Sequence, residues 1–93
     1  MMADIRQLRK KIDAVDEQIL RALGERTKIC REIGSTKQSQ AIPIRDMMRE
    51  NQVYRHVREK AAQFALDPNQ VEAVYREIVN MCSAVQKSKE NRE

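Results

Sequence analysis

Two basic side chains interrupt the apolar side of the first predicted helix of this 93-residue chain. Arg26 falls at an apolar position between Ala22 and Ile29. Lys37 lies eleven residues after Arg26, three turns on and at nearly the same angle around a helix axis. Buried charge is costly unless it is paired or liganded, so these two side chains could converge on one small anion. A guanidinium and an ammonium group are the side-chain groups suited to binding such an anion.

Polar residues also take apolar positions on the two later helices. Glu50 interrupts the second helix, and Gln86 follows Cys82 by one turn on the third. Long side chains at such positions often reach solvent, but four of them on three helices predict a shared polar cavity. Arg9 lies ~25 Å from Arg26 along the axis and ~100° around it. It cannot reach the same small ligand within one chain, although in an antiparallel dimer it could reach the partner's cavity.

The elements that position these residues are predicted to be helices. The chain contains two glycines and two prolines, and helix-forming residues dominate the remainder. Apolar spacings of three and four predict a first helix from about residue 4 to about residue 36. This helix runs through Gly24 and Gly34. Asp46 is the predicted N-cap of the second helix, and Asp67 caps the third, with Pro68 at its first position.

The apolar face of the second helix is predicted from the same periodicity. It carries Glu50 among apolar side chains: Val53, Tyr54, Val57, Ala61 and Phe64. The second and third helices, ~27 and ~33 Å long, are much shorter than a first helix of ~50 Å. We therefore expect one all-α domain over residues 1–93. Two short helices would leave part of the long apolar seam in water, which predicts a homodimer in which a second long helix covers it.

Composition narrows the possible functions. The formal net charge is +4, but basic and acidic residues are interleaved, so a solvated surface is favoured over a nucleic-acid site. Cys30 and Cys82 lack metal-ligand spacing and are predicted to pack in the core without forming a disulfide. No apolar run approaches the ~20 residues of a membrane span, and no signal peptide is recognised. We expect a cytoplasmic protein with no membrane segment, metal or cofactor.

Four segments together resemble a known family. "LRKKIDAVDEQIL", "ERTKICREIGSTK", "IPIRDMMRE" and "LDPNQVEAVYREIV" occur in the order of the all-helical chorismate mutases, the AroQ class. The resemblance covers residues 5–86. It implies an intertwined homodimer of three-helix chains with two identical sites, and the conversion of chorismate to prephenate in Phe and Tyr biosynthesis.

The resemblance also implies roles for the polar residues. Arg26 and Arg9 of the partner subunit bind the two substrate carboxylates. Lys37 and Gln86 donate to the ether oxygen of the breaking bond. Glu50 accepts from the ring hydroxyl.

Three further residues are implied to contact or line the same site. Asp46 and Arg49 lie in that region. Some family members have a serine at position 82 that touches a carboxylate, and Cys82 is a poorer donor. The expected reaction is an intramolecular Claisen rearrangement, which needs no nucleophile, metal or proton transfer. The site has only to hold a dianion in its reactive conformer and stabilise charge on the ether oxygen.

Two alternatives remain open. Isochorismate-pyruvate lyases resemble this chain too and use a similar set of basic residues, but they generally lack a carboxylate at the position of Glu50. The other alternative is a basic helical module that binds nucleic acid or a partner helix, for which binding would weaken steeply with salt.

Overall fold

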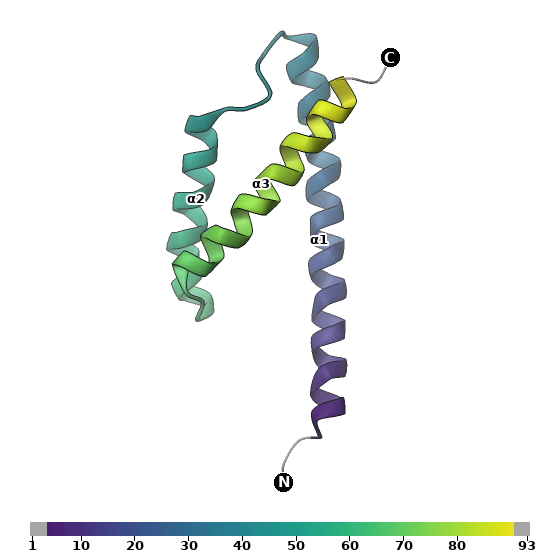
Figure 1. Cartoon of the computed structure of the whole chain (residues 1–93), viewed down its shortest axis with the longest axis vertical. Helices are drawn as coiled ribbons and strands as arrows, with labels where there is room; N and C mark the ends of the chain where they lie inside the picture. The colour runs from purple at the N-terminus through teal and green to yellow at the C-terminus, as the bar shows by residue number, and fades with distance from the viewer. Residues whose placement is uncertain (1–3, 91–93) are drawn as a thin grey trace.

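The computed structural model describes residues 4–90, and that part of the chain is helical, without strands. It contains α1 (Ile5–Ser39), α2 (Met47–Ala61), the short 3-10 helix η1 (Ala62–Phe64) and α3 (Pro68–Glu90). In Figure 1, α3 runs obliquely between α2 and the C-terminal half of α1, and the N-terminal half of α1 projects beyond the other helices. The chain measures 60 × 29 × 15 Å. The predicted three-helix, all-α architecture is therefore confirmed.

Aspartates mark the helix starts as predicted. The Asp46 carboxylate accepts a hydrogen bond from the backbone N–H of Arg49 at 3.1 Å. Asp67 precedes α3, and its carboxylate accepts from the backbone N–H of Asn69 at 2.8 Å. Each bond satisfies one of the amide groups that have no partner within the first turn of a helix. These caps fix where α2 and α3 begin.

The first helix ends within the predicted break at residues 37–46, in a left-handed turn whose type the sequence did not indicate. Ala41 has a left-handed backbone conformation, with φ of 56°. The N–H of Ile42 donates to the Lys37 carbonyl at 2.7 Å, and the N–H of Ala41 donates to the Gln38 carbonyl at 3.3 Å, which is the Schellman pattern. Ala65, with φ of 57°, ends the segment after α2 in the same way. Glycine normally occupies this position. An alanine there therefore does not predict a turn from the sequence.

The middle and C-terminal parts of α1 pack against α3 at very short range. A methyl group placed on Gly34 would lie 3.0 Å from Cγ and 3.1 Å from Cα of Gln86. Gly34 is therefore needed for close helix packing and does not end the helix. Nothing lies within 4 Å of the same position on Gly24. The first helix runs through both glycines, as predicted, and ends three residues later than expected.

The apolar face predicted for α2 is correct except at its end. Tyr54, Val57 and Ala61 are buried, but the Phe64 side chain is 70% exposed. Phe64 lies in η1, whose tighter winding of 3.0 residues per turn moves it off the α-helical face. The buried part of the chain thus lies where α3 meets α2 and the second half of α1.

Cys30 and Cys82 form a disulfide, so the prediction that they stay unpaired is wrong, although Cys30 is buried in the core as predicted. The bond joins α1 to α3, with the two Cα atoms 5.4 Å apart. The sequence could not reveal this pairing, because 52 residues separate the cysteines and only the packing of α3 on α1 brings them together. The bond fixes the register of the two helices beside Gly34.

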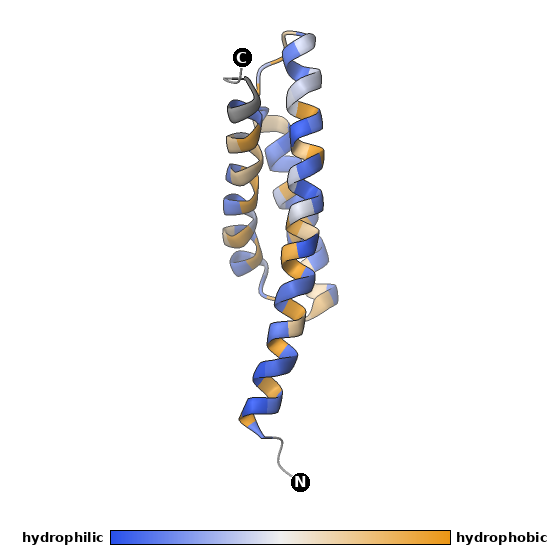
Figure 2. Cartoon of the chain, turned by 90° about the vertical axis from the view of Figure 1, so that its right-hand side faces the viewer, coloured by the Kyte–Doolittle hydropathy of each residue, from blue (hydrophilic) through white to orange (hydrophobic). Residues whose placement is uncertain are grey.

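The N-terminal half of α1 leaves its apolar side in solvent in the single chain. Figure 2 shows hydrophobic residues recurring along this half of the helix, with no other helix beside it. Five of these side chains are between 42% and 61% exposed: Ile5, Leu8, Ile12, Val15 and Ile19. No helix in the described part of the chain is both long and apolar enough to cross a membrane.

Candidate functional site

A cavity of about 350 Å³ lies between the three α-helices and the connection that leads into α2. Its polar lining includes all but one of the predicted site residues: Arg26, Lys37, Asp46, Arg49, Glu50, Cys82 and Gln86. Apolar side chains complete the wall: Ile29, Ile33, Ile44, Val53 and Val79. The structure therefore brings together residues that are up to 60 positions apart in the chain. These polar side chains share one partly open cavity whose wall also contains many apolar side chains.

Arg26 and Lys37 both reach this cavity from α1. The Arg26 guanidinium lies 3.8 Å from the Cys30 sulfur, a weak acceptor, and it has no carboxylate in salt-bridge range among the described residues. The Lys37 ammonium donates to the backbone carbonyl of Ile44. Neither cation forms a salt bridge with an acidic side chain among residues 4–87, whose side chains the structure describes, and both line the cavity that an anionic ligand would enter.

Glu50 is a buried carboxylate on the opposite wall, 8% exposed. The Arg45 guanidinium donates two parallel hydrogen bonds of 2.7 Å to this carboxylate, from Nε to Oε2 and from Nη2 to Oε1. The hydrogen bond to Glu50 raises the pKa of Arg45 above its ordinary value. Sequence reasoning did not identify this pairing. The spacing of five residues across a helix start is not one of the usual pairing distances within a helix.

Asp46 and Arg49 lie next to Glu50 at the start of α2. Asp46 is the N-cap, so one of its carboxylate oxygens is already engaged with the N–H of Arg49. The Arg49 side chain lines the cavity and adds positive charge to that wall. The cap therefore positions both Arg49 and Glu50 relative to the cavity.

Gln86 enters the cavity from α3 and is 5% exposed. Its side-chain Nε2 lies 3.1 Å from the Cys82 sulfur, and its Oε1 is buried without a hydrogen-bond partner among the described residues. An amide that meets only a weak sulfur acceptor has donor capacity left for a ligand. Buried polar atoms without a hydrogen-bond partner are rare in proteins as a whole. Where one occurs, a role in ligand binding or catalysis is one explanation.

Cys82 lines the cavity, but as one half of the disulfide. The resemblance implied a substrate contact at this position, with Cys82 as a poor donor, and the disulfide removes the donor altogether because its sulfur has no S–H. Ser83, which sequence reasoning missed, is buried and lines the same wall. It lies three residues before Gln86 and hence on the same face of α3, and this spacing could have revealed it.

Arg9 is the one predicted site residue outside the cavity. It is exposed, on the projecting half of α1. A second hollow of about 560 Å³ lies between the middle of α1 and the start of α3. Its walls are mostly apolar: Ile19, Ala22, Leu23, Leu66, Val71, Val74 and Ile78. Arg26 borders both hollows.

The first cavity can hold a small polar anion and stabilise new negative charge. Two cations from one helix, an amide from a second and a carboxylate from a third surround a volume of small-ligand size. Guanidinium groups bind carboxylates in two-pronged fashion, and an ammonium group provides a point charge. Fixed donors of this kind stabilise charge that develops on an oxygen atom.

Comparisons with known proteins agree with this chemistry. The family description "Chorismate mutase type II" matches residues 8–87. The chain is 34% identical over 92% of its length to a bifunctional chorismate mutase/prephenate dehydratase from Aquifex aeolicus, and spans 25% of that protein. It is 29% identical over 94% of its length to a chorismate mutase from Methanocaldococcus jannaschii, and spans 88% of it. A 3-dehydroquinate dehydratase from Pyrobaculum aerophilum is 34% identical over 85% of the chain, which spans 23% of that relative.

Proposed function

This chain belongs to the type II chorismate mutase family and is an isomerase of that class, and we propose that it rearranges chorismate to prephenate in the cavity between its helices. The observation that carries this proposal is the convergence of Arg26, Lys37 and Gln86 on one partly open cavity opposite Glu50. These residues come from all three α-helices. A purely structural core would not be expected to contain these charged and polar side chains, because removing charged groups from water costs free energy.

The proposed mechanism is electrostatic and conformational. Arg26 binds one carboxylate of the substrate dianion and helps hold it in its compact conformer. Lys37 and Gln86 donate to the ether oxygen as the C–O bond breaks and negative charge develops there. Glu50 accepts a hydrogen bond from the ring hydroxyl, while Asp46 and Arg49 line the same wall. No covalent intermediate is required.

We propose that the active unit is an intertwined homodimer. The exposed apolar residues of the N-terminal half of α1 need a partner surface. The apolar hollow beside Arg26 provides a complementary one. A second copy whose α1 lies in this hollow would bring Arg9 of the partner subunit toward Arg26. Two arginines would then face the two carboxylates of one substrate.

The test is chorismate consumption with identification of the product. We expect stoichiometric prephenate. Formation of salicylate and pyruvate from isochorismate, without prephenate from chorismate, would instead assign the chain to the lyases of the same fold. Binding of DNA or RNA with a steep salt dependence and no turnover would contradict both enzymatic assignments.

A further inference from the structure

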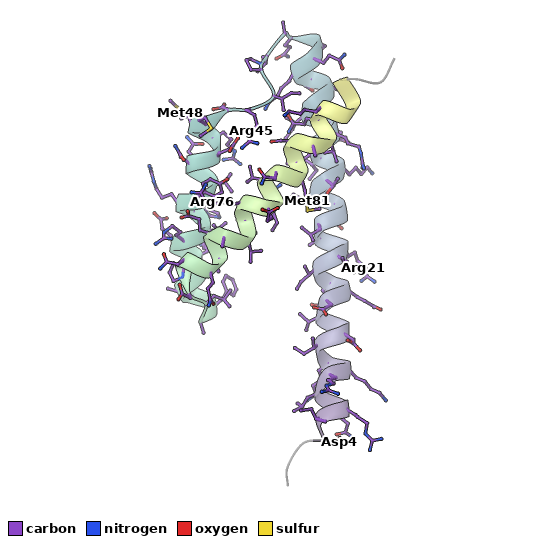
Figure 3. All side chains as sticks on the ribbon, viewed as in Figure 1. Asp4, Arg21, Arg45, Met48, Arg76 and Met81 are labelled. Carbon is purple, nitrogen blue, oxygen red and sulfur yellow. A yellow bond between two sulfur atoms is a disulfide. The ribbon has the colours of Figure 1, made fainter. Side chains whose placement is uncertain are left out.

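Arg45 binds the Glu50 carboxylate of the candidate site but does not itself line the cavity. It lies in the connection between α1 and α2 and is not part of the cavity wall. Its side chain is 43% exposed, whereas that of Glu50 is only 10% exposed. Figure 3 shows Arg45 on the side of this connection that faces α3. It therefore contacts the buried carboxylate from outside.

The contact restricts both oxygens of Glu50. The two hydrogen bonds of 2.7 Å form a planar fork on the carboxylate, the geometry that gives arginine-carboxylate pairs their directional specificity. Among the described side chains, Arg45 is the only one that donates to this carboxylate. A carboxylate has about four lone-pair sites, so two remain for a donor within the cavity.

The backbone around Arg45 is held on both sides by site residues. The carbonyl of Ile44 accepts from the Lys37 ammonium. The carboxylate of Asp46 accepts from the N–H of Arg49. The backbone position of Arg45 is therefore fixed by its two neighbours. This fixes the side from which its guanidinium binds the Glu50 carboxylate.

We propose that Arg45 is a positioning residue that holds the Glu50 carboxylate in one orientation so that it can accept the substrate's ring hydroxyl. This assignment rests on the proposed function. Without Arg45, the carboxylate can rotate and hydrate through the gap that the guanidinium leaves. The hydroxyl contact exists before and during the rearrangement, so its loss should weaken substrate binding more than it slows the bound substrate.

The first experiment compares the steady-state kinetics of Arg45→Ala, Arg45→Lys and the unmodified chain. We expect Arg45→Ala to lower kcat/KM by about tenfold to a hundredfold, mainly through KM. Arg45→Lys should recover part of the loss, because an ammonium can hold one carboxylate oxygen but not both. Wild-type kinetics in Arg45→Ala would overturn the assignment.

A double-mutant cycle separates positioning from general structural damage. In a Glu50→Gln background, Arg45→Ala should change kcat/KM by less than about twofold, because the group that Arg45 orients is already altered. The same loss in both backgrounds would overturn the assignment. Arg58→Ala is the matched control. Arg58 is 41% exposed, pairs with Glu72 at 3.2 Å, and lies outside the cavity. Its kinetics should remain those of the unmodified chain.

The outcomes distinguish this inference from the function on which it rests. If the unmodified chain turns over chorismate and Arg26→Ala abolishes the activity while Arg45→Ala does not reduce it, only the role of Arg45 is refuted. If the unmodified chain produces no prephenate, the proposed function fails and the role of Arg45 fails with it.

Discussion

The two halves of α1 share the same spacing of apolar residues, with basic residues among them. Their surroundings in the single chain differ. Residues 5–19 present exposed apolar side chains and an exposed Arg9. Residues 26–37 pack on α3 and place Arg26 and Lys37 in a cavity. Both halves follow the same three-four periodicity. The difference is that, within one chain, only the second half contributes buried residues against α3, namely Cys30 and Gly34, although Ile29 and Ile33 remain 54% and 42% exposed.

In the proposed dimer, one helix would contribute to two different sites. Its C-terminal half builds the cavity of its own chain, and its N-terminal half is suited to complete the cavity of a second copy. A long helix in an otherwise small chain is then a functional feature. In the proposed dimer, this exposed apolar seam would be the surface through which each subunit supplies its own Arg9 to the cavity of the other.

The largest effect is expected from removing the cations of the covered half. Arg26→Ala and Lys37→Ala should each lower kcat/KM by about a thousandfold, because each removes one of the two cationic side chains that the described part of α1 places in the cavity wall. Circular dichroism should show an unchanged helical fold. Arg21→Ala is the control, since Arg21 is exposed on the side of α1 away from α3. Near-normal rates for Arg26→Ala would contradict the site assignment.

The second prediction concerns the exposed half. Ile19→Lys should convert a dimer into monomers in sedimentation velocity. Burying one isoleucine contributes about 2 kcal/mol, and a two-fold interface contains it twice. Activity should fall in parallel, because the cavity loses its partner arginine. Gln18→Lys adds the same charge one residue away and should leave association intact. A monomeric unmodified chain with full activity would refute the need for a dimer.

The third prediction tests the disulfide that fixes the covered half against α3. Reduction, or the double substitution Cys30→Ser and Cys82→Ser, should lower the free energy of unfolding by about 4 kcal/mol, from the chain entropy of the loop that the bond closes. Denaturant unfolding with and without dithiothreitol measures this change. The serine variant should not respond to the reductant. Equal stability of the oxidised and reduced protein would contradict a structural role for the bond.

The fourth prediction compares the two glycines of α1. Gly34→Ala should destabilise the fold by about 1–3 kcal/mol and slow catalysis, because the added methyl group meets the backbone and side chain of Gln86. Gly24→Ala has open space around it and should stabilise the helix by up to about 1 kcal/mol. Thermal unfolding and kinetics of both variants measure the difference. Equal effects of the two substitutions would show that helix propensity alone matters.

Much of the fold could be predicted because each signal was local. Helical periodicity and the aspartate caps Asp46 and Asp67 act within a few residues, and they place α2 and α3 correctly. The turns at Ala41 and Ala65 could not be predicted, because alanine is not a residue that favours left-handed backbone. The exposure of Phe64 depends on a 3-10 turn that periodicity does not reveal.

The cavity was predictable for a different reason. Charged residues at apolar helix positions are costly, so Arg26, Lys37 and Glu50 could be recognised before any packing was known. Pairings between distant residues could not be recognised. The Cys30–Cys82 disulfide depends on where α3 packs on α1. The hydrogen bonds from Arg45 to Glu50 depend on the path of the connection before α2. No local sequence pattern predicts either arrangement.

Mixing two inactive variants tests most directly whether the two halves of α1 serve different subunits' sites. Arg9→Ala and Arg26→Ala chains, mixed in equal amounts and allowed to exchange, should form heterodimers with one intact site. Random assortment then gives about a quarter of the wild-type activity per chain. Exchange can be verified with a mass tag on one variant. Proven heterodimers with no more activity than the two parent variants would contradict a site shared between subunits.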